Sequence, residues 1–120
     1  MIENVPIISD VLIMADLLRD LGAKVLLDQA ARTVTITAAD VRSTNPNPEL
    51  VTQMRASFQV TGPLLARFGQ FDCAAPGGCQ LGTRPVSVDI AGFQRMGATV
   101  ALADGVFHAK ADALLSLIHI

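Results

Sequence analysis

The ten residues PGGCQLGTRP, numbers 76–85, contain one thiol, three glycines and one arginine. A thiol can donate a proton near neutral pH when nearby cations or backbone dipoles tune its pKa, and Arg84 follows Cys79 by five residues. The glycines allow the backbone to approach a ligand closely. We therefore interpret Cys79 as a candidate catalytic residue, against the alternative of an inert small residue in a turn.

Two arginines are candidates for binding anions. Arg55 interrupts an otherwise apolar helical pattern, and its alternative role is a surface charge on an apolar stem. Arg84 comes just before Pro85, which fits the first turn of a helix, and helix N-termini attract anions. By contrast, we predict structural or surface roles for Cys73, in an expected strand, and for His108.

The composition excludes several classes of function. A net charge of −2 argues against a nucleic-acid-binding surface, and five Phe with no Trp or Tyr argue against base stacking. No apolar run approaches the roughly 20 residues that span a bilayer, and the N-terminus lacks the form of a signal peptide. We expect a cytoplasmic chain with free thiols, no metal site and no cofactor.

A low share of charged residues, 17%, indicates apolar surface that another segment covers. The local patterns predict an α+β fold. The expected elements are a strand over 4–8, a helix to residue 21 with Ser9 as N-cap, strands over 23–28 and 32–38, a long helix from Pro48 interrupted at Gly62-Pro63 before residues 64–69, a strand over 70–75, a helix from Pro85 to Met96, and a hairpin over 98–111 turning at Asp104-Gly105.

The chain contains an internal repeat. LLRDLGAKVLL (17–27) and GFQRMGATVAL (92–102) align with an offset of 75 residues. Each copy predicts a helix, a Gly-Ala turn, a strand, a second turn and a second strand. The sequence therefore predicts repeated helix-plus-hairpin units, an α/β-type repeat, and not a doubly wound open sheet.

Three stretches resemble the UDP-N-acetylglucosamine 1-carboxyvinyltransferase family of enolpyruvyl transferases. They are LVTQMRASFQVTGPLLARFG (50–69), PGGCQLGTRPV (76–86) and MGATV (96–100), and the likeness runs from about residue 3 to about 113. The resemblance implies part of an inside-out α/β barrel. Family members are several times longer, with two domains and the active site between them. Residues 1–114 are thus interpreted as a partial domain whose partner is the missing remainder.

The resemblance also implies an activity. Family members transfer the enolpyruvyl group of phosphoenolpyruvate to the 3′-hydroxyl of UDP-N-acetylglucosamine and release phosphate, the first committed step of peptidoglycan synthesis. Cys79 matches the proton donor, which also forms a covalent adduct with phosphoenolpyruvate and is the target of fosfomycin. Arg55 matches an arginine that contacts the substrates. The residues matching the uridine-nucleotide site are Arg84, Pro85, Val86, Ser87 and Val88.

Two positions depart from the family pattern. Ser87 stands where the family usually has aspartate, and Asp89 where it often has histidine. The family's Lys-Asn motif is expected upstream of Met1, and its general-base aspartate and a further arginine downstream. Two interpretations follow: an active-site-bearing fragment that is inactive alone, or a non-catalytic module that binds a nucleotide sugar or a partner.

The last six residues, LSLIHI, break the pattern. One translation of a common transposase sequencing adapter yields these residues, so we interpret 115–120 as a non-native tail. The alternative is a genuine apolar C-terminal strand.

Overall fold

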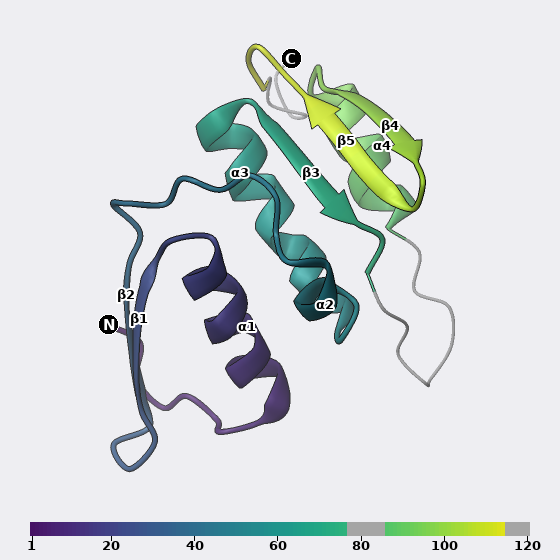
Figure 1. The fold of residues 1–120 in the computed structure, drawn as a ribbon. Coiled ribbons are helices and arrows are strands. Elements are labelled where there is room, and N and C mark those ends of the chain that lie inside the picture. Colours follow the sequence, from purple (N-terminus) through teal and green to yellow (C-terminus); the bar gives the residue numbers. More distant parts are fainter. Residues whose placement is uncertain (77–85, 115–120) are drawn as a thin grey trace.

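The computed structural model describes residues 1–76 and 86–114 (Figure 1). Helix α1 lies against the β1–β2 hairpin, and α4 lies behind the sheet of β3, β5 and β4 (Figure 1). The elements are α1 (Ser9–Asp20), β1 (Lys24–Asp28), β2 (Thr33–Thr37), α2 (Pro48–Val51), the 3₁₀ helix η1 (Arg55–Val60), α3 (Thr61–Phe68), β3 (Gln70–Ala74), α4 (Ser87–Arg95), β4 (Thr99–Ala103) and β5 (Val106–Lys110).

The predicted repeat is confirmed in three dimensions, because both helices end in the same turn. Gly22 and Gly97 have φ of 108° and 105°, a backbone region that favours glycine. In the first copy the amide of Ala23 donates to the carbonyl of Leu18 at 3.0 Å, and in the second the amide of Ala98 donates to that of Phe93 at 2.9 Å. This hydrogen bond closes a Schellman motif and leads each helix into its hairpin.

The two hairpins have matching registers. Val25 faces Ile36 across β1–β2, and Val100 faces Ala109 across β4–β5. The second hairpin turns at Asp104 and Gly105, both with positive φ, as predicted. The copies differ in one respect: β3 pairs with the outer edge of β5, whereas the same edge of β2 carries one isolated bridge, from Ile2 to Val34.

The predicted strand over 4–8 is wrong. Asn4 has φ of 57°, which ends the extended run, and Pro6 has no amide hydrogen for a ladder. Helix α1 then starts one residue earlier than expected: Ile8 is the N-cap, without a side-chain cap, and Ser9 is the first helical residue.

The predicted long helix from Pro48 is also wrong, because it breaks at Met54. Met54 is extended, with φ of −152° and ψ of 147°, and separates α2 from η1. The buried hydroxyl of Ser57 lies 2.8 Å from the carbonyl oxygen of Val51 and 2.6 Å from that of Met54. Such local side-chain hydrogen bonds offer the backbone an alternative to the α-helical ladder.

The predicted interruption of a helix at Gly62 and Pro63 is wrong. Both residues lie in the first turn of α3. Proline fits there because amides in the first turn of a helix have no helical partner. Gly69, with φ of 73°, ends α3 and leads directly into β3.

The core consists of two clusters. The larger one joins both repeat copies through α1, α2, η1, α3, β3 and β5, and the smaller one lies under the first hairpin around Ala15, Val25 and Val34. No helix in the described part of the chain has the length and apolar character needed to cross a membrane. That part also shows no cluster of three or more His, Cys, Asp and Glu suited to a metal ion.

Gly22→Ala should destabilise the chain, since the new methyl group would lie 2.9 Å from the carbonyl oxygen of Asp40 at a positive φ. We expect a loss of about 1–3 kcal/mol in the free energy of unfolding. Gly92→Ala is the matched control: Gly92 is helical with open space around it, and the substitution should stabilise by about 0.5–1 kcal/mol. Urea unfolding of both variants measures the difference, and equal effects would contradict the assigned turn.

Candidate functional site

We call residues 76–85 the cysteine segment. The structure describes both of its flanks, while Cys79, Arg84 and Pro85 lie outside the described residues. On one side β3 ends at Ala74, and the amide of Ala75 donates to the carbonyl of Gly105 at 2.9 Å. On the other side Val86 is the buried N-cap of α4. The segment's two ends are therefore anchored by different elements of the second repeat copy.

Arg55 lies close to the flank formed by the start of α4. Its guanidinium Nη2 is 3.2 Å from the carboxylate Oδ2 of Asp89, which lies in the first turn of α4. The two side chains are only 25% and 30% exposed, so solvent screens this ion pair less than a fully exposed one. The structure thus brings Arg55 to the same helical turn as two predicted substrate-binding residues, Ser87 and Val88.

The local backbone explains how Arg55 reaches this position. Arg55 is the first residue of η1, directly after the extended Met54. The Ser57 hydroxyl bonds across this break, and Phe58 and Val60 anchor η1 in the core. The apolar helical pattern was therefore a correct signal of burial, but the arginine comes at a chain break and not in the middle of a long helix.

The start of α4 has the electrostatic character of an anion site. The first hydrogen bond of the helix runs from the Ile90 amide to the Val86 carbonyl, so the amides of Ser87, Val88 and Asp89 have no helical acceptor. Such amides and the helix dipole favour a negative group, and within the first turn the Asp89 carboxylate supplies one and pairs with Arg55. Val86 is buried, while Ser87 and Val88 are exposed.

The pairing of Asp89 with Arg55 was not predictable from the sequence. Local patterns carry no signal for this ion pair, because Arg55 and Asp89 are 34 residues apart in the chain. In the structure, the Asp89 carboxylate both suits the positive end of α4 and orients the guanidinium.

Cys73 is structural, as predicted. It is a free thiol on β3 with no exposed surface, and burial raises its pKa from 9.0 to about 12. At neutral pH it is almost entirely protonated and inaccessible, so it is a poor nucleophile. His108 is exposed on β5 and pairs with Asp72 on the neighbouring strand, again outside the region of Arg55 and α4.

The burial of Cys73 predicts that its thiol does not react in the folded chain. At pH 7.5, iodoacetamide should leave Cys73 unmodified in the folded chain, because thiolate formation requires a pH near its raised pKa of about 12. In urea, where the burial is lost, Cys73 should be modified readily. Peptide mass spectrometry measures both states, with Cys73→Ala as the control. Rapid modification of Cys73 under native conditions would contradict its assignment as a buried thiol.

Comparisons with known proteins identify relatives of this chain. Residues 1–117 match the sequence model of the family EPSP synthase (3-phosphoshikimate 1-carboxyvinyltransferase). UDP-N-acetylglucosamine 1-carboxyvinyltransferase 1 of Clostridium acetobutylicum is 38% identical over 114 residues, 95% of this chain and 27% of the relative. The UDP-N-acetylglucosamine 1-carboxyvinyltransferase of Coxiella burnetii (strain RSA 331) is 39% identical over 114 residues, 95% of this chain and 26% of the relative.

The structural comparison confirms the predicted fold class. The crystal structure of the enolpyruvyl transferase NikO from Streptomyces tendae matches with a TM-score of 0.82 and 25% identity. The match covers 94% of this chain and 24% of NikO, and the chain likewise spans about a quarter of the length of the curated relatives. On the family match and these likenesses together, the chain belongs to the EPSP synthase (3-phosphoshikimate 1-carboxyvinyltransferase) family of enolpyruvyl transferases.

Proposed function

We propose that these residues supply the cysteine segment and an anion-binding arginine to an enzyme that transfers the enolpyruvyl group of phosphoenolpyruvate to the 3′-hydroxyl of UDP-N-acetylglucosamine. Phosphate is released, and the product enters peptidoglycan synthesis in the cytoplasm. The names of the relatives support the reaction. The observation that carries the proposal is the position of Arg55 against the first turn of α4, beside Ser87 and Val88.

The substrates demand positive charge. Phosphoenolpyruvate carries a phosphate and a carboxylate, and the nucleotide sugar carries a diphosphate. The Arg55 guanidinium and the first-turn amides of α4 provide donors for such groups, and Arg84 adds a second guanidinium close in sequence to that turn. Arg55 contacts the substrates in this proposal, while Arg84, Pro85, Val86, Ser87 and Val88 hold the uridine nucleotide.

The reaction requires a proton donor. The sugar hydroxyl loses its proton and adds to C2 of phosphoenolpyruvate while C3 takes up a proton. The phosphate then leaves from C2 as C3 gives up a proton and the double bond reforms. Cys79 is the proposed donor to C3 and forms a covalent adduct with phosphoenolpyruvate. The other thiol is unsuited to this role, because Cys73 is fully buried with its pKa raised to about 12.

We expect residues 1–120 alone to be inactive. The general base that takes the hydroxyl proton and the second domain that closes over the substrates belong to other parts of the family's sequence. Holding two substrates in a reactive geometry contributes roughly 7–11 kcal/mol to lowering a barrier, and two arginines with one thiol do not replace that.

A chimera tests the function. Residues 1–114 replace the corresponding segment of the full-length Clostridium acetobutylicum relative, and phosphate release is measured with phosphoenolpyruvate and UDP-N-acetylglucosamine. We expect turnover by the chimera and none by residues 1–120. Cys79→Ala should lower kcat by about 10²–10⁴, the usual contribution of a general acid. Cys73→Ala is the matched control and should retain activity once the stability loss is taken into account.

The same chimera should be alkylated by fosfomycin at Cys79 in the presence of the nucleotide sugar, as seen by peptide mass spectrometry. Modification of Cys73 in place of Cys79 would refute the catalytic assignment. Tight binding of UDP-N-acetylglucosamine without turnover would instead favour the non-catalytic module.

Ser87→Asp should tighten binding of UDP-N-acetylglucosamine to the chimera. An aspartate at the first position of α4 restores a charged acceptor for the uridine and suits the positive end of the helix dipole. A charge-assisted hydrogen bond contributes on the order of 1.5–3 kcal/mol, so calorimetry should show a Kd lower by about tenfold or more. Ser87→Asn is the uncharged control. An unchanged Kd in the aspartate variant would show that another group already recognises the uridine.

A further inference from the structure

The carboxylate of Asp89 occupies the place beside Arg55 that an anionic group of a substrate would take. We propose that Asp89 is an intramolecular competitor: its carboxylate pairs with Arg55 when no ligand is bound, and the phosphate or diphosphate of an entering ligand displaces it. Asp89 then lowers the affinity of the site for anions and restricts it to groups that bind a guanidinium better than one carboxylate oxygen does. The inference deepens the proposed function and rests on the anion-binding role given there to Arg55.

Two attractive features act on the same carboxylate. Asp89 lies in the first turn of α4, so its charge is close to the positive end of the helix dipole. Its Oδ2 atom is also 3.2 Å from Nη2 of Arg55. The amides of Ser87 and Val88 lie in the same turn and have no helical acceptor. An anion that approaches these amides and Arg55 therefore meets a like charge at short range, which costs affinity unless the carboxylate moves away.

The geometry of the ion pair allows exchange. The contact between Nη2 and Oδ2, at 3.2 Å, is longer than the about 2.7–2.9 Å that is typical of charge-assisted hydrogen bonds. The side chains of Arg55 and Asp89 are 25% and 30% exposed, so water reaches both groups as the pair opens. A phosphate can accept two parallel hydrogen bonds from one guanidinium, and it therefore competes well with this contact.

Another arginine shows a contact that does not exchange. Arg67 donates to the backbone carbonyls of Ala38 and Ala39 at 2.6 and 3.1 Å. Those carbonyls cannot move away unless the local backbone rearranges, whereas the Asp89 carboxylate can leave Arg55 by a change of side-chain rotamer. The ion pair at α4 is thus suited to opening when a ligand binds.

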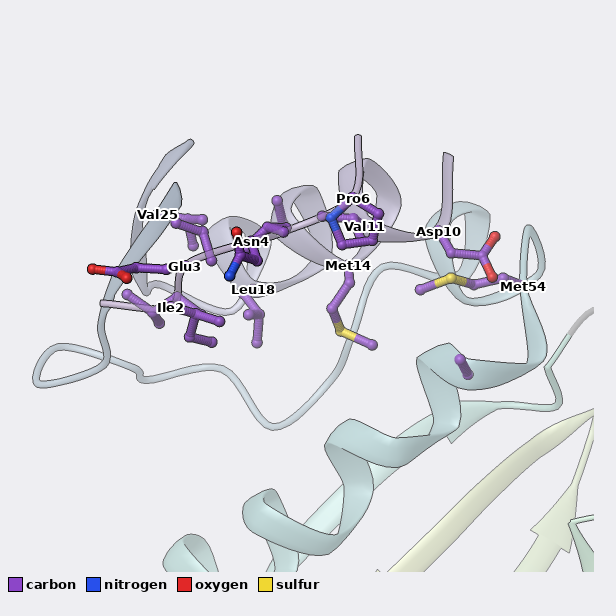
Figure 2. A pocket seen from close by; sticks show the side chains of 15 residues that line it. Ile2, Glu3, Asn4, Pro6, Asp10, Val11, Met14, Leu18, Val25 and Met54 are labelled. Carbon is purple, nitrogen blue, oxygen red and sulfur yellow. The ribbon is translucent and has the colours of Figure 1, made fainter. Parts of the chain in front are cut away.

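Opening the pair leaves both elements in place. Met54, directly before Arg55, is buried and lines an apolar cavity against α1 (Figure 2). Further along η1, the ring of Phe58 lies 6.2 Å from that of Phe71, which lies 5.9 Å from that of Phe93 in α4, as centroid distances. Apolar packing therefore fixes η1 relative to α4 independently of the ion pair, and the exchange requires only side-chain movement.

Neutralising Asp89 should raise anion affinity while it lowers stability. Asp89→Asn keeps the size of the side chain and removes its charge, and it is introduced into the chimera that carries residues 1–114. Calorimetry at low salt measures binding of inorganic pyrophosphate, a simple anion, and of UDP-N-acetylglucosamine. Both Kd values should fall by about threefold to tenfold, the range of a partly screened ion pair, and the gain should shrink at high salt. The urea midpoint of the ligand-free chimera should fall, because the ion pair and the interaction with the helix dipole are lost.

A purely structural role predicts other signs. If Asp89 only held η1 against α4, Asp89→Asn would lower stability and weaken binding together. Asp89→Glu keeps the charge and should lower neither Kd. Asp89→Ser repeats the measurement with a second neutral side chain, so a folding defect in one variant does not decide the outcome.

Two controls isolate the pair. Asp16→Asn is the matched variant, because Asp16 pairs with Arg19 on α1 at 2.8 Å and its loss changes the net charge by the same amount on another helix. It should leave both Kd values unchanged. In an Arg55→Gln background, Asp89→Asn should change the Kd of pyrophosphate by less than about twofold, because the guanidinium for which Asp89 competes is gone.

Pyrophosphate binding that is unchanged or weaker in both Asp89→Asn and Asp89→Ser would overturn the proposal. So would an equal gain in Asp16→Asn or in the Arg55→Gln background. A chimera whose pyrophosphate affinity depends on Asp89, but which neither binds UDP-N-acetylglucosamine nor releases phosphate, would refute the proposed reaction and support the competitor role. Turnover by a chimera whose anion affinity is indifferent to Asp89 would support the reaction and refute the competitor role.

Discussion

Edge-to-face packing of four phenylalanines holds the region around the candidate site together. Phe58 lies 6.2 Å from Phe71 and 5.7 Å from Phe107, and Phe71 lies 5.9 Å from Phe93, as ring-centroid distances. These rings join four elements. Helix η1 carries Arg55, β3 and α4 flank the cysteine segment, and β5 is the central strand of the sheet. Truncating a buried ring of this kind usually costs about 3–5 kcal/mol, so the position of Arg55 relative to α4 depends directly on this packing.

The Arg55–Asp89 pair gives the candidate site an internal balance of charge. Asp89 holds the guanidinium at the first turn of α4, which limits the conformations that Arg55 samples before a ligand arrives. The same carboxylate competes with an anionic substrate for the helix N-terminus. The negative charge of the first helical turn therefore lies at Asp89, next to the arginine, while Ser87 in the same turn is uncharged.

The local features of the fold were predictable from the sequence, and the distant ones were not. Gly22 and Gly97 indicated the helix ends, and Asp104-Gly105 indicated the hairpin turn, because glycine and aspartate tolerate the positive φ that these turns need. The break at Met54 escaped prediction since it depends on one buried hydroxyl, Ser57, reaching back to two carbonyls. Of the candidate site, Arg55 and residues 86–88 were predicted separately as substrate-binding residues, while the pairing of Arg55 with Asp89 required contacts between segments far apart in sequence.

The placement of β3 has a consequence for the order of folding. The β1–β2 hairpin pairs residues that are close in sequence, from Lys24–Thr37 inwards, and so does β4–β5. The β3–β5 pairing is different, because Asp72 and His108 are 36 residues apart and the cysteine segment lies between them. Contacts between distant residues form more slowly than local ones, since loop closure costs entropy before the contacts form. The two hairpins should thus form early, and the neighbourhood of Arg55 and α4 should be among the last parts of the chain to assemble.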